Sequence, residues 1–491
     1  MANVAGDRRD RPLTVVLIKP KARLGTILGL QRFQCLEPLE LGYLAAVIAP
    51  PHRVHVLDLR RHRFADAALN HALHRLEPDV VGISGYTHEA SEVKRLAAWV
   101  RRARPAARVV VGGHHATVAP RDFDAPSIDA IVRGEGCAPF REIVARLSSG
   151  EDLGGIPNVL LSGAGFDDNA AAGWPEYPDP ASLPRPRRDL WDSRWYTSAW
   201  LAEHPRDWAT IFPPVASVRT SFGCTMKCSF CIVPHLSGGR HSTRPVQDVV
   251  EEIAGLSASH VYFCDDENFI DETFALELAE ALAERGVAKR YFAWTRSTTV
   301  NRSPDLLRRW REIGLDAAFL GFEFPTDEEL RAAHKGGSVA ANERAHATLR
   351  ALGVAVHAAF MVRPEYGAEE FDRLRKYVRE MPPAQCSFTV CTPSPGTCDY
   401  RAMLPRVWVD RPYDLHDCMH PLTPTALPLR EYARRFATQA AEGVAKTPLR
   451  EARRPIPPGD IARAAWAARR YESAFATLYR DYPRELWSST P

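Results

Sequence analysis

Short apolar runs alternate with amphipathic stretches along the first 150 residues of the chain. The stretches at residues 65–76 and 89–102 carry apolar side chains at helical spacing. The apolar runs between such stretches are strand-like and lie at Leu13–Ile18, Val54–Leu57, Val80–Ser84, Arg108–Val111 and Ala130–Val132. Strands and helices in this alternation predict a doubly wound α/β domain with a parallel sheet, which we place at residues 1–148.

The carboxyl ends of these strands are the expected place for a ligand, because open parallel sheets bind ligands there. The first strand is followed by Lys19-Pro20. Three later ends carry glycines, which let the backbone come close to another group, in the sequences Gly85-Tyr86-Thr87-His88, Gly112-Gly113-His114-His115 and Gly134-Glu135-Gly136. The pattern predicts a ligand-binding domain and does not name the ligand.

Residues 149–214 lose this periodicity and become rich in Pro and Gly. Because Trp and Tyr are also frequent there, the segment is expected to be a linker packed between domains and not a free coil. Strand–helix alternation resumes over residues 215–400 and predicts a βα barrel, full or partial, with its chemistry at the C-terminal strand ends. Its strand candidates are Ala216–Thr220, Val261–Cys264, Arg290–Thr295, Ala317–Phe322, Ala355–Met361 and Ser387–Thr392. Residues 401–491 are mostly helical in pattern.

Composition limits the classes of protein that need to be considered. The 491 residues are 45% apolar and 25% charged, as in ordinary soluble globular proteins. The formal net charge is only +3, so nucleic acid is not an expected partner. No apolar run is long enough to span a membrane, and residues 1–11 are too polar for a signal peptide, which together favour a cytoplasmic protein. Its ten cysteines are then expected to be reduced, so a close group of them indicates metal binding or catalysis.

One such group exists, because Cys224, Cys228 and Cys231 lie within eight residues after the first strand of the second α/β region. Thiolates are soft anionic ligands that suit iron–sulfur clusters or zinc. Zinc sites made of local cysteines usually have two separated pairs, and this chain has no second pair. The structural alternative is a closed site with a distant fourth ligand, namely His235, Cys264 or His241. The strand-end position favours an open catalytic [4Fe–4S] cluster, in which three cysteines leave one iron free for another ligand.

The spacing Cys-x3-Cys-x2-Cys on a loop after the first barrel strand is similar to the signature of radical S-adenosylmethionine (SAM) enzymes. The preceding domain resembles the cobalamin-binding domain of one subclass, through Gly112-Gly113-His114-His115-Ala116-Thr117 and Arg133-Gly134-Glu135-Gly136. The resemblance covers about residues 13–400. It implies a Rossmann-like cobalamin-binding domain, a radical SAM βα barrel, and a helical C-terminal domain with a substrate lid around residues 413–425.

The resemblance implies a class B, cobalamin-dependent radical SAM methyltransferase. Its cofactors would be a [4Fe–4S] cluster, S-adenosyl-L-methionine and methylcobalamin. A 5′-deoxyadenosyl radical would take hydrogen from an unactivated carbon of a small molecule, such as a secondary metabolite or a lipid, and that carbon would receive the methyl group of methylcobalamin. The electron would come from an external donor of the flavodoxin or ferredoxin type.

Three other functions compete with methyl transfer. Within the family, some relatives cyclise, contract a ring or rearrange their substrate without net methyl transfer. A methylthiotransferase would need three further cysteines in the first domain, where only Cys35 and Cys137 occur. A different class is a non-enzymatic iron–sulfur sensor, which would hold a closed cluster and would not cleave SAM.

Several positions match places where the family contacts SAM. Phe230 matches the aromatic residue near the adenine, or else packs under the loop. Arg296 matches a basic contact to the SAM carboxylate, since a guanidinium can bind a carboxylate through two hydrogen bonds. Glu323 matches an acidic contact to the ribose or the amino group, although Arg296 and Glu323 are alternatively an internal ion pair. Lys335 also matches a family pattern, or caps a helix. Contacts to the amino group are expected after the second barrel strand, at Asp265, Asp266 and Asn268, unless these residues cap the helix that follows.

The cobalamin half departs from the commonest pattern. Many cobalamin proteins offer a histidine to cobalt from an Asp-x-His-x-x-Gly loop after the first strand, and Lys19-Pro20 begins a loop with neither Asp nor His. The lower face of the cobalt is therefore expected to lack histidine, or to lie near Tyr86, Thr87 and His88. The remaining expected cofactor contacts are Gly112, Gly113, His115, Gly134 and Glu135. His115 is alternatively bonded to a neighbouring strand.

Overall fold

The computed structural model describes residues 11–175, 177, 179–200, 210–408, 413–443 and 456–487. The chain divides into two compact units. Unit 1 comprises residues 1–22 and 38–192, and unit 2 comprises residues 23–37 and 193–491. The segment predicted as a linker, residues 149–214, is thus shared between the two units and not set apart from both.

Unit 1 is built on a six-stranded sheet in the order β3-β1-β4-β5-β6-β7. Its strands are β1 (Thr14–Lys19), β3 (Arg53–Asp58), β4 (Val80–Ser84), β5 (Arg108–Gly112), β6 (Ala130–Val132) and β7 (Val159–Leu161). All neighbouring pairs are parallel except β6–β7. Every residue of β1 is buried, as expected for a central strand that is covered on both faces.

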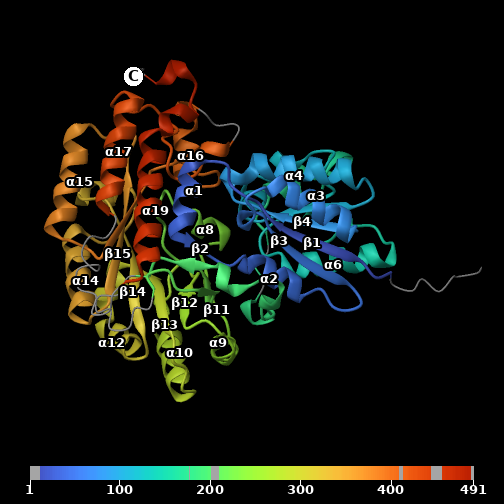
Figure 1. Cartoon of the computed structure of the whole chain (residues 1–491), viewed down its shortest axis with the longest axis horizontal. Coiled ribbons are helices and arrows are strands. Elements are labelled where there is room, and N and C mark those ends of the chain that lie inside the picture. Colours follow the sequence, from blue (N-terminus) through green and yellow to red (C-terminus); the bar gives the residue numbers. More distant parts are fainter. Residues whose placement is uncertain are drawn as a thin grey trace, which may run out of the picture. The chain divides into compact units, whose positions relative to one another are not determined.

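Helices cover both faces of this sheet, so the prediction of a doubly wound domain is confirmed. In Figure 1, α3 and α4 lie on one side of the strands, and α2 and α6 lie on the other. The helices and 3-10 turns of the sheet region are α2 (Leu39–Ala46), η1 (Leu59–Arg61), α3 (Ala65–Leu76), η2 (Thr87–Glu89), α4 (Ala90–Ala103), α5 (His114–Val118), η3 (Pro120–Phe123) and α6 (Cys137–Ser149). The rest of the unit holds η4 (Gly163–Gly165), α7 (Asp168–Ala172), η5 (Pro180–Ser182) and η6 (Arg188–Leu190).

The strand order of unit 1 reverses at β1, because β3 lies on one side of it and β4 on the other. Open α/β sheets bind ligands in the crevice at such a point, outside the carboxyl ends of the strands. The ends that meet here are those of β1, at Lys19, and of β4, before Tyr86, with β5 and its Gly112 beside them.

Unit 2 contains a second six-stranded sheet, in the order β9-β12-β13-β14-β15-β16, with every neighbouring pair parallel. The strands are β9 (Val215–Val218), β12 (His260–Phe263), β13 (Arg290–Thr295), β14 (Leu315–Glu323), β15 (Ala355–Val362) and β16 (Gln385–Val390). Within the described residues β9 and β16 end the sheet and do not pair, so the predicted barrel is a partial one.

The sheet of unit 2 has one face under helices and one face turned inward. Along β16 the burial of successive residues alternates between half-buried and buried, and the buried Phe388 belongs to the core under the helices. The inward face carries stacked aromatic rings, with centroids 4.7 Å apart for Tyr262 and Phe292 and 3.9 Å apart for Trp294 and Phe319.

The helices that follow these strands are α9 (Val246–Ala254), α10 (Glu272–Glu284), α11 (Ser297–Arg302), α12 (Pro304–Glu312), α13 (Asp327–Ala332), α14 (Val339–Ala351) and α15 (Ala368–Glu380). Of these, α10, α12, α14 and α15 lie outside the sheet in Figure 1. The strand–helix units place the carboxyl ends of all six strands at one edge, where barrel enzymes keep their chemistry.

Short elements complete unit 2. Two antiparallel pairs join β2 (Gln34–Cys35) to β8 (Thr197–Ser198) and β10 (Ser221–Gly223) to β11 (His241–Thr243). The remaining helices and turns are α1 (Gly25–Phe33), η7 (Ser193–Trp195), α8 (Val233–Leu236), α16 (Cys398–Met403), η8 (Leu404–Arg406), η9 (Tyr413–Leu415), α17 (Leu429–Gly443), α19 (Pro458–Ala476), η10 (Leu478–Asp481) and η11 (Arg484–Leu486). The C-terminal region is therefore helical as expected. Among the described helices, none is long and apolar enough to cross a membrane.

Candidate functional site

The three cysteines lie on the loop that follows β9 and β10, at the carboxyl edge of the second sheet. Cys224 and Cys228 are buried, and Cys231 is half-buried. Burial, together with the negative charges of Cys228 and Cys224, raises the pKa of the Cys231 thiol to about 12. The three thiols are therefore close enough to interact electrostatically.

Local geometry holds the start of this loop in place. Gly223 has φ +84°, and a side chain there would collide with the carbonyl oxygen of Arg240, so the position requires glycine. Further along, the Ser229 N–H donates to the carbonyl of Ala333 at 3.1 Å, and the Cys231 N–H donates to that of Cys228 at 3.2 Å. The loop is thus anchored both to its own β-hairpin and to the end of α13.

The number and type of the thiols fit an iron–sulfur cluster. Among the described residues, no three His, Cys, Asp or Glu side chains are grouped so that they could hold a metal ion. In a [4Fe–4S] cluster each cysteine binds a different iron, so the sulfurs do not have to converge on one point. Three buried or half-buried thiols on one loop meet that requirement, and thiolate is the ligand type that such clusters take.

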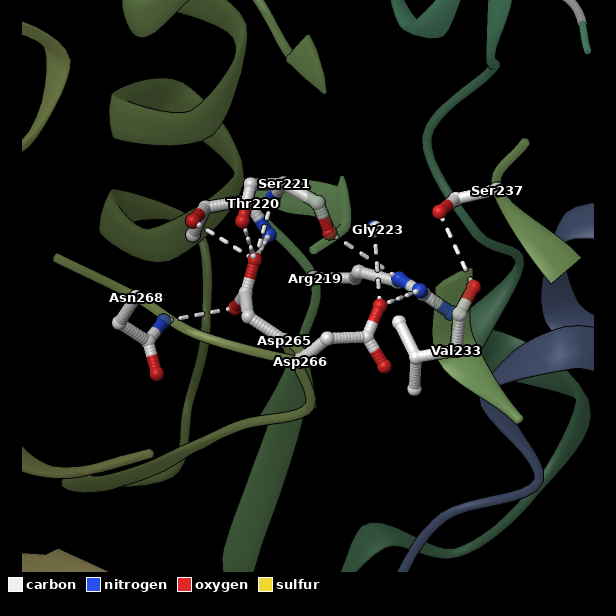
Figure 2. Close-up of polar contacts among 9 residues, drawn as sticks. All are labelled: Arg219, Thr220, Ser221, Gly223, Val233, Ser237, Asp265, Asp266 and Asn268. Carbon is white, nitrogen blue, oxygen red and sulfur yellow. Dashed lines mark hydrogen bonds and ion pairs between the residues drawn. The ribbon is translucent and has the colours of Figure 1, made fainter. Parts of the chain in front are cut away.

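Asp265, directly after β12, fixes the segment that leads into the cysteine loop. Figure 2 shows one of its carboxylate oxygens facing Thr220 and Ser221, whose backbone N–H groups and hydroxyls all donate to it. The other oxygen accepts from the Asn268 side chain at 2.8 Å. Burial raises the pKa of the Asp265 carboxyl, and the hydrogen bonds from Ser221 oppose that shift. Protein donors thus occupy both oxygens of the carboxylate.

Asp266 and Asn268 are also engaged by the protein. One oxygen of Asp266 lies 3.0 Å from the Arg219 guanidinium and accepts the Gly223 N–H at 2.9 Å (Figure 2). The side-chain oxygen of Asn268 accepts the backbone N–H of Trp294 at 2.7 Å and so connects the loop after β12 to β13. The helix that follows is capped instead by Asp271, which accepts the Phe274 N–H. The three predicted residues therefore do not act as its N-cap.

Arg296 reaches from the end of β13 to the cysteine loop. Its Nη1 donates to the Cys228 sulfur at 3.7 Å, and its Nη2 donates to the carbonyl of Lys335. Its Nε–H is buried and has no partner among the described residues. A buried guanidinium with a spare donor beside thiolates suits an anionic ligand, so Arg296 fits both a cluster and a carboxylate.

The predicted alternative of an ion pair between Arg296 and Glu323 is wrong. Glu323 is paired with Lys335, whose Nζ lies 2.6 Å from its carboxylate. β14 ends at Glu323 with a left-handed backbone, φ +62°, which turns the chain toward α13. Lys335 follows α13, and its side chain lies over Gly321. Its ammonium group, and not the Arg296 guanidinium, is therefore the partner of the Glu323 carboxylate.

Phe230 packs into an apolar cluster that contains Phe324 and Leu330, between the cysteine loop and α13. This packing is the structural role considered for it from sequence. Glu267 was not singled out in the sequence beyond its acidic run, yet it is buried and accepts the Thr295 hydroxyl at 2.8 Å. Its charge acts on both Cys224 and Arg296. The only sequence signal for this role of Glu267 is its place in the acidic run that follows β12.

The candidate site of unit 1 lies at the carboxyl ends of β1, β4 and β5. The Lys19 ammonium sits 4.7 Å from the centre of the Tyr86 ring and 2.8 Å from the Glu40 carboxylate. Tyr86 is 52% exposed and stacks in parallel on His88, and His114 lies 5.9 Å from the same ring. Aromatic, amine and imidazole groups thus gather at the point where the strand order reverses.

The other predicted residues of unit 1 mainly serve the fold. Gly113 has φ +96°, and a side chain there would press against Gly85 at 2.9 Å, so glycine is needed for packing against β4. His115 is fully buried and lies 3.2 Å from Asp122. The Gly134 N–H bonds the Thr117 hydroxyl at 2.9 Å, and Glu135 accepts the Cys137 N–H at 2.8 Å. Gly112 has ordinary space around it.

This edge of unit 1 offers groups that fit a large polar cofactor. The Thr87 hydroxyl is buried and has no partner among the described residues. With the exposed Tyr86 ring beside it, the strand edge presents both a hydrogen-bonding group and an aromatic face. No histidine follows β1, so the residues available there differ from those of cobalamin proteins with a first-loop histidine.

Comparison with known proteins matches two separate stretches of the chain to two families. The family model for the B12 binding domain matches residues 25–144, and the model for the radical SAM superfamily matches residues 218–378. Hopanoid C-3 methylase from Methylococcus capsulatus is 28% identical over 406 residues, which are 82% of this chain and 75% of that protein. Anaerobic magnesium-protoporphyrin IX monomethyl ester cyclase from Rubrivivax gelatinosus is 26% identical, over 73% of this chain and 64% of that protein.

Solved structures agree on the fold. The radical SAM methyltransferase TsrM from Kitasatospora setae, with cobalamin and a [4Fe–4S] cluster bound, superposes with a TM-score of 0.60 at 19% identity, over 77% of this chain and 75% of that one. The radical enzyme OxsB, with aqua-cobalamin and SAM bound, gives 0.65 at 14% identity, over 95% of this chain and 72% of that one. The chain belongs to the cobalamin-dependent radical SAM enzymes, whose cofactors are a [4Fe–4S] cluster, SAM and cobalamin.

Proposed function

We propose that this enzyme methylates an unactivated carbon of a small molecule, with methylcobalamin as the methyl donor. The observation that carries the proposal is that one chain joins a B12-binding domain to a three-cysteine loop with a buried arginine beside it. The bound cofactors supply a carbon-centred radical and a methyl group. The names of relatives such as hopanoid C-3 methylase favour methyl transfer.

Different side chains of unit 2 would bind the iron–sulfur cluster and SAM. Cys224, Cys228 and Cys231 would bind three irons and leave the fourth for SAM. Arg296 would place its positive charge between the Cys228 sulfur and the SAM carboxylate, and its buried Nε–H is a donor still to be used. Burial of such a guanidinium strengthens its pull on an anion, because little water competes there.

The ion pair of Glu323 and Lys335 would set the remaining polar boundary of this site. It lies at the end of β14, next to the carbonyl of Lys335 that accepts from Arg296. Below it the inward face of the sheet is aromatic, with Trp294 and Phe319 in contact. Such a face would keep water from a reactive radical and favour an apolar part of the substrate.

We assign the domains as follows: a cobalamin-binding domain at residues 1–148, a radical SAM domain at residues 215–400, and a C-terminal region from residue 401 that includes a substrate lid. Support for the lid is that the carbonyl of Cys418, within residues 413–425, accepts the N–H of Val390, the last residue of β16, at 2.7 Å.

We also propose an external one-electron donor and a cytoplasmic setting. All ten cysteines lie within the described residues and none is in a disulfide, as in a reducing compartment. A cluster that must be reduced before it acts needs such a donor.

The test needs no substrate. The chain is reconstituted anaerobically with iron, sulfide and hydroxocobalamin, desalted, and given reductant and excess [methyl-13C]SAM. We expect labelled methylcobalamin, about one per chain, together with S-adenosylhomocysteine and slow release of 5′-deoxyadenosine. SAM cleavage without labelled methylcobalamin would instead support a cyclase-type reaction, which the cyclase relative makes the second candidate. If neither labelled methylcobalamin nor 5′-deoxyadenosine formed, an iron–sulfur sensor would be the remaining candidate.

A further inference from the structure

Three ring side chains form a row on the inward face of the second sheet. Trp294 of β13, Phe319 of β14 and His357 of β15 occupy paired positions on neighbouring strands. The ring centroids of Trp294 and Phe319 are 3.9 Å apart, and those of Phe319 and His357 are 4.9 Å apart. We call these three residues the aromatic row. Because neighbouring strands lie about 4.8 Å apart, the row extends for about 10 Å across the sheet.

Solvent reaches the aromatic row. Each of its three side chains is half-buried, whereas the rings of Tyr262 and Phe292, one level further from the carboxyl ends, are buried. On the other side of the row, two positions nearer the carboxyl ends, β15 and β16 carry the small side chains of Ala359 and Ser387. The row is therefore the accessible base of the site whose rim holds Arg296 and the cysteine loop.

The inward positions around the aromatic row are uncharged. Beside the three rings, these positions of β14, β15 and β16 hold Gly321, Ala359, Gln385 and Ser387.

The row itself is also neutral. Burial lowers the pKa of His357 to about 4, so its imidazole carries no charge at pH 7. Toward the carboxyl ends, the first charged groups on β13 and β14 are Arg296 and Glu323, and the protein engages both of them. A charged group lying on the row would lose its water without gaining an opposite charge. The row therefore suits an uncharged body.

His357 is the polar member of the aromatic row that lacks a partner. Its Nε2 has no hydrogen-bond partner among the described residues. A neutral imidazole offers one donor and one acceptor nitrogen, and a hydroxyl group can pair with either of them. A buried polar atom without a partner is unfavourable, so a hydroxyl group of a ligand would relieve that cost.

We propose that the aromatic row binds an uncharged fused-ring body of the substrate, and that His357 forms a hydrogen bond with a hydroxyl group on that body. This inference rests on the proposed function, because it takes the inward face of unit 2 as the side on which the radical meets its substrate. It narrows the substrate to a fused-ring alcohol and excludes ions such as nucleotides from the row. Trp294 and Phe319 supply apolar contact, and His357 sets the position of the hydroxyl group.

The experiment measures binding and needs no turnover. Holoenzyme reconstituted with iron, sulfide and hydroxocobalamin is saturated with SAM, without reductant. It is then dialysed to equilibrium against 1-pyrenemethanol, 1-methylpyrene or 1-pyrenecarboxylate at neutral pH. The first two probes differ by one hydroxyl group, and the third is an anion with the same rings. Fluorescence of the extracted probe gives a dissociation constant for each.

Three variants are compared with the wild type. His357→Phe keeps a ring in the aromatic row and removes its nitrogens. His357→Gln removes the ring and keeps a donor and an acceptor. His346→Phe is the matched control, because this histidine is also buried but lies in α14, outside the sheet (Figure 1).

The informative quantity is the dissociation constant of 1-methylpyrene divided by that of 1-pyrenemethanol. We expect this ratio to fall about 5-fold in His357→Phe, as for the loss of one hydrogen bond. Comparing the ratio between variants cancels the difference in hydration of the two probes. It should stay within about 2-fold of wild type in His357→Gln and in His346→Phe. In the wild type, 1-pyrenecarboxylate should bind at least about 10-fold more weakly than 1-pyrenemethanol.

Four results would overturn the proposal. They are an unchanged ratio in His357→Phe, an equal fall in His346→Phe, binding of the carboxylate as tight as that of the alcohol, or no binding of any probe. None of them affects the labelling of methylcobalamin, so the proposed function can stand when this inference fails. Probe binding as expected in a chain that forms no labelled methylcobalamin would overturn the proposed function and leave the fused-ring site in place.

Discussion

Asp265 accepts hydrogen bonds through both of its carboxylate oxygens, so an amide at this position must turn an NH2 group toward a donor. In Asp265→Asn the amide nitrogen meets either the donors of Thr220 and Ser221 or the Asn268 amide. We expect the free energy of unfolding to fall by about 1–3 kcal/mol, the cost of leaving a buried donor unsatisfied. Iron retained per chain after reconstitution should fall as well. Urea unfolding and iron assay measure both effects.

Asp266→Asn is the matched comparison, because this neighbour forms a partly exposed pair with Arg219. Such pairs are worth little, so a loss within about 1 kcal/mol is expected. Equal losses in the two variants would show that Asp265 does not fix the loop in the way described.

At the residue scale the sequence indicated which segments form the site and less often which atoms meet. Asp265 and Asn268 were recognised after the second barrel strand, but the donors of Ser221 lie 44 positions away. Glu323 was recognised at the end of its strand, whereas its partner is Lys335 and not Arg296. A pairing of this kind depends on a backbone turn, here at Glu323 with its left-handed φ. The pattern of side chains in the sequence does not predict such a turn.

At the scale of elements, the end of β5 depends on a glycine that packs against β4. In Gly113→Ala the new methyl group would lie 2.8 Å from the Ser84 hydroxyl and 2.9 Å from the Gly85 backbone, at φ +96°. We expect a loss of about 2–4 kcal/mol in the free energy of unfolding, from strain and from displacement of β4. Cobalamin retained after reconstitution should fall in parallel.

Gly112→Ala is the control for this prediction. A methyl group there would lie 3.6 Å from the nearest atom, the carbonyl oxygen of Val132, which is an ordinary contact. A change within about 1 kcal/mol is expected for a site without strain. If Gly112→Ala were the more damaging variant, close approach to a ligand at this glycine would explain the motif better than packing between strands.

A buried histidine and its partner carboxylates link the segment around Asp417 to α1 and η10 of unit 2. His420 lies 3.0 Å from Asp417 and 3.2 Å from Asp481 of η10, and Asp417 also accepts the hydroxyl of Thr26 in α1 at 2.6 Å. Burial alone would lower the pKa of His420, but the two carboxylates raise it to about 9. The imidazolium is therefore the form that holds these elements together at neutral pH.

The raised pKa predicts the pH range in which this stabilisation is lost. It is fully present below the unfolded pKa of about 6.5 and declines as pH rises through about 9. The wild-type urea midpoint should therefore fall between pH 7 and pH 10. The urea midpoint of His420→Gln should be lower than that of the wild type at pH 7, and it should change less between pH 7 and pH 10. A wild-type midpoint that is flat from pH 7 to pH 10 would contradict the assignment of the charge.

The regular elements followed from the sequence and the shortest ones did not. The strands of both sheets were predicted from their apolar runs, as in Val80–Ser84, except β7, which lies within the segment predicted as a linker. The pairs β2–β8 and β10–β11 involve strands of two or three residues, which have no periodic signal. Their pairing comes from segments far apart in the chain.

For the whole molecule, residues 23–37 illustrate what sequence order conceals. They directly follow β1, yet they belong to unit 2, where Thr26 bonds Asp417 across 391 positions. A boundary read along the chain cannot show such a crossing, because the contact depends on side chains that meet only after folding. The two family matches, by contrast, follow motifs that are local in sequence.

If each unit binds its own cofactor, removing one should spare the other. Cys224→Ala, Cys228→Ala and Cys231→Ala should each reduce the iron retained per chain from about four to near zero and abolish SAM cleavage. Cobalamin should remain at about one per chain, because the cysteine loop belongs to unit 2 and the groups gathered around Tyr86 belong to unit 1. Cys398→Ala removes an exposed cysteine outside the loop and should retain both cofactors. Iron assay and corrin absorbance on the same desalted samples decide the outcome, since loss of corrin together with iron would mean that the cluster and the corrin depend on one shared site.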